Sequence, residues 1–283
     1  MFGFLNIYKP QGMTSHDVVA ILRRITKIKQ IGHTGTLDPF AEGILPICIG
    51  KATRLIEYLD DDKAYIGTVQ LGKSTTTYDT EGDVVNISNK KATLQEIQEA
   101  LPKFRGEIQQ LPPIYSAIKV NGKKLYEYAR KGEEVKIEPR RVNIHKLEIV
   151  NFDEEKQTVD LHIECSKGTY IRSIANDLGE ALGCYGHLIK LLRIKAGKFG
   201  INEAIKLDTL ETKEQVEKNL IYPLEYLNYP KYELSESEKE KVSHGMGVNI
   251  NLEDGITLLI SHGKLIAVAN VENKKAKILK VFI

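Results

Sequence analysis

The stretch at residues 31–57, IGHTGTLDPFAEGILPICIGKATRLIE, places the tightest limits on how this chain can fold. Gly32 and Gly35 permit backbone angles that other residues avoid, and the Asp38-Pro39 pair favours a turn that can present a side chain. A rigid loop of this kind suits a reacting group, which has to be held in place. The stretch therefore predicts a loop that presents the Asp38 carboxylate.

Hydrogen bonds within the loop would supply that rigidity, because its threonine and aspartate side chains can bond nearby backbone amides. An alternative is the start of a helix, with Asp38 as the N-cap and Pro39 at the first helical position. A Walker phosphate loop does not fit, since Leu45 and Ala52 stand where that motif needs Gly and Ser or Thr.

Part of this stretch, GHTGTLDPFAEGILPICIGKATRL, resembles the signature of the tRNA pseudouridine(55) synthases, the TruB family. The resemblance implies that Asp38 is the catalytic nucleophile. It also implies that His33 fills the gap left in the RNA when the target base is flipped out. The residues alone leave a second role open for His33, that of a turn histidine bonding its own loop.

The segment after this loop, KAYIGTVQLG, alternates as a half-buried strand. The resemblance implies that Lys63 and Tyr65 belong to the site, with Tyr65 stacking on the target uracil. A cross-strand aromatic in the core is the alternative for Tyr65. The next segment, TTTYDTEGDVV, matches a second family motif, a polar turn beside the active site that includes Asp79, although acidic turns before strands are common.

A third match is ECSKGTYIRSIANDLGEALG, which is predicted to form a strand end, a turn and a helix. Arg172 falls in the first turn of that helix, where the helix dipole disfavours a cation, so a carboxylate partner is expected. The resemblance implies that Arg172 pairs with Asp38. It also implies that Tyr170 and Leu191 help to wall the substrate pocket.

The charges of the chain are unevenly spread, although its net charge is only +2. Residues 103–146 carry eleven Lys or Arg against five acids, and residues 187–198 are basic without any acid. By resemblance 103–146 is the thumb insertion that closes on the T arm of tRNA, whereas a basic run is otherwise often a solvated face. The candidate phosphate ligands are Lys123, Lys124, Arg130, Arg140, Arg141, Lys190 and Arg193.

The length of 283 residues allows one large domain and a small one. We expect an α+β fold, with a mixed, mainly antiparallel sheet flanked by helices in a pseudouridine-synthase-like catalytic domain at residues 1–230. Residues 231–283, after a connector with two prolines, are predicted to be β-rich. Their pattern resembles a PUA-type RNA-binding domain, which implies contact with the acceptor stem of tRNA.

No metal, cofactor or membrane is predicted. Cys48, Cys165 and Cys184 are scattered and form no C-x-x-C pair, which favours buried thiols in a reducing cytoplasm. The histidines show no metal-ligand spacing. No segment reaches the roughly 20 apolar residues of a membrane span. We therefore expect a soluble, cytoplasmic monomer.

The implied reaction breaks the N1–C1′ bond of a uridine, turns the uracil and joins its C5 to C1′. An ionised Asp38 could attack C1′ or assist removal of the C2′ proton, and the residues leave both routes open. Two rival functions also remain open. One is an RNA-binding or RNA-folding module without turnover, and the other is an RNA-guided pseudouridine synthase, which the well-matched thumb disfavours.

Overall fold

The computed structural model describes residues 1–283 and is built around a ten-stranded sheet. Eight strands follow the order β14-β1-β3-β12-β4-β11-β10-β7, while β2 pairs with β3 and β13 with β12. Most pairs are antiparallel, but β1–β14 and β3–β12 are parallel. The strands are β1 (Gly3–Lys9), β2 (Ile31–His33), β3 (Glu42–Ile49), β4 (Lys63–Leu71), β7 (Gly106–Gln110), β10 (Arg140–Asp153), β11 (Thr158–Cys165), β12 (Gly186–Ala196), β13 (Phe199–Gly200) and β14 (Ile205–Lys206).

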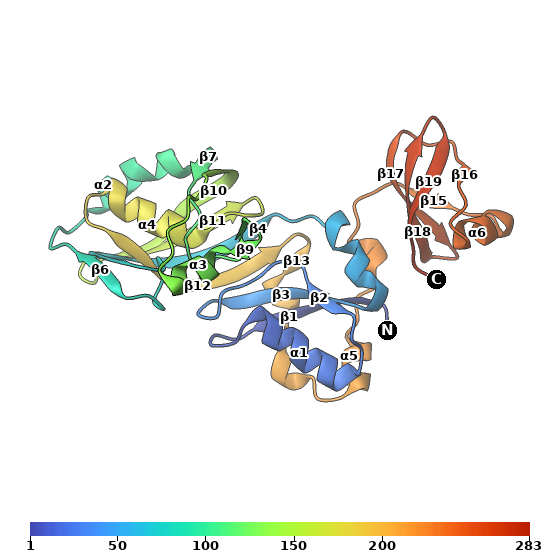
Figure 1. Ribbon diagram of the computed structural model, residues 1–283, viewed down its shortest axis with the longest axis horizontal. Helices are drawn as coiled ribbons and strands as arrows, with labels where there is room; N and C mark the ends of the chain where they lie inside the picture. Colours follow the sequence, from blue (N-terminus) through green and yellow to red (C-terminus); the bar gives the residue numbers. More distant parts are fainter.

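Helices flank this sheet, as the sequence predicted (Figure 1). Figure 1 shows α2 and α4 above one end of the sheet, and α1 and α5 below the other end. They are α1 (Ser15–Thr26), α2 (Leu94–Ala100), α4 (Ile171–Ala181) and α5 (Lys213–Lys218), with short 3₁₀ turns η2 (Leu101–Phe104), η3 (Ile201–Glu203), η4 (Leu207–Thr209) and η5 (Pro223–Glu225). A small hairpin, β5 (Lys73–Thr75) and β6 (Val84–Ile87), extends from the same end as α2.

Local sequence signals account for the helix boundaries. α1 begins after Thr14, whose side chain accepts a hydrogen bond from the N–H of Asp17 while the Asp17 carboxylate accepts from the N–H of Thr14. Ser15, the first residue of the helix, is therefore free to bond elsewhere. Ile97 in α2 and Leu101 in η2 are buried, whereas Leu94 at the start of α2 is 43% exposed.

The core consists of several apolar clusters. One cluster lies between the sheet and α2 and α4, and another lies where α1 covers β1 and β3. In β4 and β11 buried side chains mostly alternate with less buried ones, the pattern of strands with one apolar face. All three cysteines are buried and form no disulfide.

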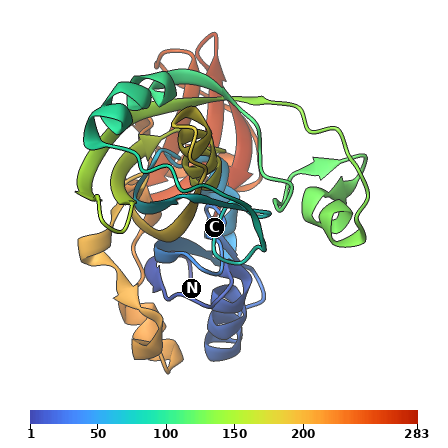
Figure 2. The same cartoon turned by 90° about the vertical axis from the view of Figure 1, so that its left-hand side faces the viewer.

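The basic insertion is shorter than the predicted 103–146. Strands β7 and β10 pair in the main sheet with Gln110 opposite Arg140, so only residues 111–139 leave it. This segment, called the thumb below, contains β8 (Lys119–Val120), β9 (Lys123–Lys124) and α3 (Leu125–Lys131). Figure 2 shows it in green, standing away from the body of the molecule.

The C-terminal residues form a second sheet with the order β15-β17-β18-β19-β16. Its elements are β15 (Lys231–Glu233), α6 (Glu236–Ser243), β16 (Val248–Asn249), β17 (Gly255–Ser261), β18 (Lys264–Glu272) and β19 (Lys275–Val281). Leu258 and Phe282 share an apolar cluster with Phe4 and Leu55 of the main body. The second sheet is therefore packed against the first part of the chain rather than merely tethered to it.

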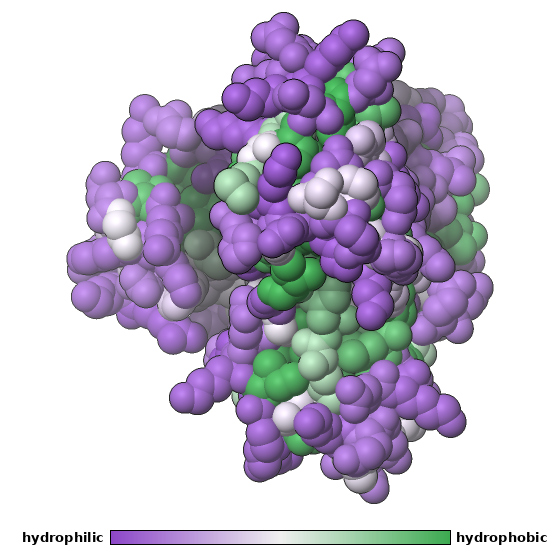
Figure 3. Space-filling view, turned by 90° about the vertical axis from the view of Figure 1, so that its right-hand side faces the viewer, coloured by the Kyte–Doolittle hydropathy of each residue, from purple (hydrophilic) through white to green (hydrophobic).

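Polar contacts reinforce this packing at the 3₁₀ helix η1 (Gly50–Tyr58). The guanidinium of Arg54 donates to the carbonyl of Val281 at 2.9 Å, and Lys280 forms an ion pair with Glu57. Figure 3, which faces the side bearing the second sheet, shows hydrophobic surface between lobes that are otherwise hydrophilic. No helix in the structure has the length and apolar character needed to span a membrane.

Candidate active site

Asp38 lies in the turn that joins β2 to β3. No helix begins at Pro39, and the N–H of Ala41 donates to the carbonyl of Asp38 at 3.1 Å, closing a turn. The alternative in which Asp38 caps a helix is therefore excluded. Its side chain is 32% exposed and opens into a cavity of about 690 Å³.

Arg172, in the first turn of α4, faces the Asp38 carboxylate as predicted. Nε of Arg172 lies 3.0 Å from Oδ2 of Asp38, but its N–H is not aimed at that oxygen, so the contact is an ion pair rather than a hydrogen bond. The other two nitrogens are committed elsewhere: Nη1 lies 3.1 Å from Oδ2 of Asp79, and Nη2 donates to the carbonyl of Tyr115 in the thumb at 3.0 Å. One buried guanidinium thus joins two carboxylates and the base of the thumb.

Asp79, predicted from the second motif to belong to the substrate site, faces Arg172 and not the cavity. Its side chain is 1% exposed and does not reach the cavity. Besides Arg172, it accepts hydrogen bonds from the hydroxyl of Thr77 and from the N–H of Glu81. Asp79 therefore holds Arg172 in place from behind.

Burial has the largest effect on the pKa of Asp38 and raises it above its ordinary value. The Arg172 guanidinium opposes this rise, whereas the Asp79 carboxylate adds to it. Arg172 therefore does not give Asp38 a net lower pKa. Arg172 instead limits a rise that burial would otherwise make larger.

The loop around Asp38 is held by side chains from other elements, not by its own threonines. The hydroxyl of Ser15 both accepts from the N–H and donates to the carbonyl of Leu37, at 2.8 and 3.0 Å. On the other side, Nζ of Lys9 donates to the carbonyl of Pro39 at 3.4 Å, and burial lowers the pKa of Lys9 to about 8. Sequence reasoning missed both anchors, because neither lies near Asp38 along the chain.

Arg193, predicted as a phosphate ligand, bonds the backbone of the protein itself and supplies a third anchor. Its side chain is 1% exposed, and its guanidinium donates to the carbonyls of Gly35, Thr36 and Ile44 at 3.2, 3.3 and 2.7 Å. A signal was present in the sequence. Arg193 follows Leu191 by two residues on a strand, so both side chains point to the same face.

The remaining predicted residues line the same cavity as Asp38 and Arg172. They are His33, Lys63, Tyr65, Tyr170 and Leu191. Tyr65 and Leu191 are 7% and 6% exposed and form an apolar part of the cavity wall. Burial lowers the pKa values of Lys63 and His33. Nδ1 of His33 is buried without a partner, so this histidine does not bond its own loop as the alternative required.

Comparison with known proteins identifies the class of this site. A family model described as TruB family pseudouridylate synthase (N terminal domain) matches residues 23–171. The chain belongs to the TruB family. A second model, tRNA pseudouridylate synthase B C-terminal domain, matches residues 172–227, so the two models together include the Asp38 loop, Arg172 and Leu191.

Curated TruB-family relatives match over nearly the whole chain. A tRNA pseudouridine synthase B from Caldanaerobacter subterraneus subsp. tengcongensis is 43% identical over 286 residues, covering 99% of each chain. One from Clostridium kluyveri is 40% identical over 293 residues and covers both chains completely. Among solved structures, a Cbf5-Nop10-Gar1 complex matches with a TM-score of 0.72 at 26% identity, covering all of this chain and 85% of the other. The TruB-family enzyme described here is thus a pseudouridine synthase.

The thumb of this TruB-family enzyme reaches the active-site cavity, because Tyr115, Lys124 and Tyr126 also line it. Within the thumb, the cations of Lys124 and Arg130 lie 5.4 and 5.3 Å from the ring centre of Tyr126. Of the other phosphate candidates, Lys123 lies 3.8 Å from Glu133, Arg141 lies 3.4 Å from Glu107, and Arg140 and Lys190 are exposed. These cations remain available to RNA, because surface ion pairs are weak.

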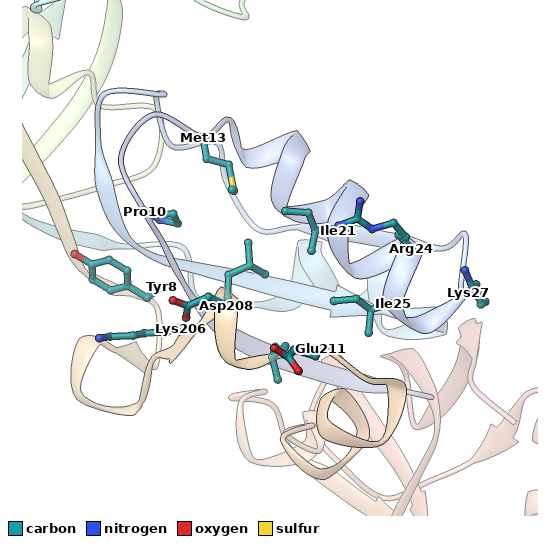
Figure 4. Close-up of a pocket in the computed structure, with 12 residues that line it drawn as sticks. Tyr8, Pro10, Met13, Ile21, Arg24, Ile25, Lys27, Lys206, Asp208 and Glu211 are labelled. Atoms are coloured by element: carbon teal, nitrogen blue, oxygen red, sulfur yellow. The ribbon is translucent and has the colours of Figure 1, made fainter.

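A second cavity, of about 800 Å³, contains none of the predicted site residues (Figure 4). It lies between α1 and residues 206–211, with Met13, Ile21, Ile25, Leu207 and Leu210 among its apolar lining. Its charged lining is of mixed sign, with Arg24, Lys27 and Lys206 against Asp208 and Glu211. The carboxylate–arginine pair is absent from it, so the chemistry belongs to the Asp38 cavity.

Proposed function

We propose that this TruB-family enzyme isomerises uridine to pseudouridine in the T loop of tRNA, at position 55, with Asp38 as its catalytic carboxylate. One observation carries the proposal: Asp38 is partly open to a cavity of about 690 Å³ while Arg172 contacts it at 3.0 Å. A cavity of that volume lies in the range of about 300–1,000 Å³ that suits small ligands, and it can admit one nucleoside.

The chemistry needs an ionised carboxylate beside C1′ of the target. When the N1–C1′ bond breaks, positive character develops at C1′, and the charge of Asp38 stabilises it by direct attack or by assisting removal of the C2′ proton. The uracil then turns and C5 bonds to C1′, as the bond to Asp38 breaks in the first route or the C2′ proton returns in the second. C5 loses its proton, and N1 gains one. Atoms balance without a cofactor, because the product is an isomer of the substrate.

The target base has to leave its stack to reach Asp38, at a cost on the order of a few kcal/mol. Stacking on Tyr65 would return roughly 1–3 kcal/mol of this cost. His33 lines the same cavity, burial lowers the pKa of its ring, and it is suited to occupy the space that the base leaves. Lys63, Tyr170 and Leu191 complete the walls that hold the detached uracil.

A stand-alone tRNA enzyme is favoured over the RNA-guided alternative by the comparisons. Curated relatives named tRNA pseudouridine synthase B share 40–46% identity with this chain, whereas the Cbf5-Nop10-Gar1 structure shares 26%. The thumb supports the same choice, because it places Lys124 and Tyr126 on the cavity wall. The thumb would then contact the T arm directly as part of this chain.

Two surfaces are proposed for the rest of the tRNA. The basic thumb would bind phosphates of the T arm, while residues 231–283, as a PUA-like domain, would bind the acceptor stem. Each Lys or Arg that neutralises a phosphate adds salt-dependent affinity. The single chain holds every residue of the proposed site, so a monomer suffices.

Asp38→Asn tests the proposal. Asn keeps the shape but cannot carry charge, so tritium release from C5-labelled uridine in a T-arm transcript should fall by several powers of ten, each about 1.4 kcal/mol of barrier. Filter binding of the same transcript should be almost unchanged. Asp160→Asn is the matched control, because Asp160 bonds Thr68 on the main sheet away from the cavity. Substantial turnover by pure Asp38→Asn would refute the assignment.

A further inference from the structure

Arg193 carries a buried positive charge without a carboxylate partner. Its side chain is 1% exposed, and no carboxylate oxygen lies within 4.0 Å of its guanidinium nitrogens. Burying an unpaired charge is costly unless hydrogen bonds satisfy it. Three backbone carbonyls do satisfy the guanidinium, but its charge is left unneutralised beside the active-site cavity, which it helps to line.

The three carbonyls that Arg193 binds lie on both sides of Asp38. Gly35 and Thr36 precede Asp38 by three and two residues, and Ile44 lies just beyond the turn, in β3. One planar guanidinium therefore clamps the entry and the exit of the Asp38 turn onto β12. The ammonium of a lysine cannot reproduce this geometry, because its donors do not form a rigid fork.

Strand register places Arg193 between the two strands nearest the reaction. On β12 it stands opposite Gly43 of β3 and opposite Tyr65 of β4. Gly43 has a φ of +109°, and a Cβ there would lie 2.3 Å from the carbonyl oxygen of Arg193, so the two strands meet more closely than any side chain would allow. Positive charge from Arg193 also opposes the rise that burial causes in the pKa of Tyr65.

We propose that Arg193 is a positioning residue for two side chains of the site at once. Its guanidinium fixes the backbone that aims Asp38, and Arg193 stands opposite Tyr65 in the strand register. This inference rests on the proposed roles of Asp38 and Tyr65. An arginine that served the fold alone would affect stability without affecting the rate of the chemical step.

The test compares Arg193→Gln and Arg193→Lys in single-turnover reactions at saturating tRNA, beside filter binding and thermal unfolding. For Arg193→Gln the rate constant should fall about 100-fold and Kd should change less than about threefold, because a displaced reacting group costs rate whereas phosphate contacts set affinity. Arg193→Lys keeps the charge without the fork, so its rate constant should lie between those of Arg193→Gln and the wild type. Arg105→Gln is the matched control, since Arg105 also donates two bonds to a carbonyl, that of Leu147, outside the cavity.

Two outcomes would overturn the inference. A folded Arg193→Gln protein with the wild-type rate constant would limit Arg193 to supporting the fold. An Arg193→Lys protein that fails to fold would also limit Arg193 to supporting the fold, because the hydrogen bonds of the guanidinium would then be required for folding of the sheet. Asp38→Asn in the same assay separates the two claims: its activity would refute the proposed function, whereas its inactivity beside fully active Arg193 variants would refute this inference alone.

Discussion

Replacing Asp79 with Asn tests whether the charges around Arg172 set the pKa of Asp38, the proposed catalytic carboxylate. Asp79 is 1% exposed, and its Oδ2 lies 3.1 Å from Nη1 of Arg172. Asn keeps the shape and one acceptor oxygen for the Thr77 hydroxyl and the Glu81 N–H, but it removes the negative charge. The substitution therefore changes the electrostatics behind Arg172 with little change in packing.

The expected cost in stability follows from the burial of this pair. Removing one partner of a buried ion pair costs about 3–5 kcal/mol. The cost here should be about 2–3 kcal/mol, because Arg172 keeps Asp38 and the carbonyls of Thr77 and Tyr115 as partners. At about 2–4 °C per kcal/mol, Tm should fall by roughly 5–10 °C, which differential scanning calorimetry can measure.

The effect on pH dependence has a definite sign. The negative charge of Asp79 raises the pKa of Asp38, so removing it should lower that pKa. Because the reaction needs ionised Asp38, the acid limb of the kcat/KM profile should move to lower pH in Asp79→Asn and to higher pH in Arg172→Gln. Asp83→Asn, an exposed acid in the same turn, is the matched control. An acid limb that moves up, or does not move, in Asp79→Asn would refute this reasoning.

Three further predictions concern other parts of the molecule. Burial raises the pKa of Asp38 above its value in the unfolded chain, so the folded state loses stability as the pH rises from the unfolded pKa to the folded pKa. Asp38→Asn should therefore raise Tm at a pH above both pKa values and leave Tm unchanged at a pH below both. Equal shifts of Tm at the two pH values would contradict this. Removal of residues 231–283 should weaken tRNA binding and leave turnover at saturating tRNA largely intact. It should also lower Tm, because it removes Leu258 and Phe282 from the apolar cluster that contains Phe4. A truncated protein that folds but is inactive would contradict this prediction. Neutralising cations of the thumb should reduce the slope of log Kd against log salt by about 0.7–0.9 for each phosphate that the variant no longer neutralises, and an unchanged slope would place the RNA elsewhere.

Local signals predicted the parts of the site that depend on short stretches of chain. The Asp38 turn, the half-buried strand with Tyr65 and the position of Arg172 in a first helical turn all follow from spacing, alternation and helix electrostatics. The placement of a cation at a helix start predicted that Arg172 has a carboxylate partner, and the resemblance to the TruB family identified that partner as Asp38. Each of these inferences depends only on residues that are close in the sequence, or on the single charge of Arg172, which requires a partner of opposite charge.

The sequence did not reveal the positions of Arg193 and Asp79, and the physical reason is the same for both. Composition shows that Arg193 and Asp79 are charged, but only the packed sheet shows that both are buried and bound within the protein. Lys9 and Ser15 anchor a loop more than twenty residues away, a relation that only tertiary contacts create. The length of the thumb was overestimated because basic composition continues into β7 and β10, where strand pairing, not charge, decides the boundary.

The burial of every cysteine makes the thumb accessible to selective labelling. Burial raises the pKa of Cys48 to about 12 and that of Cys165 to about 11, so these thiols should resist maleimide in the folded enzyme. A single exposed thiol introduced by Glu134→Cys would then carry a fluorophore alone. Energy transfer from that dye to labelled RNA would report the distance between the thumb and the RNA during a single catalytic cycle.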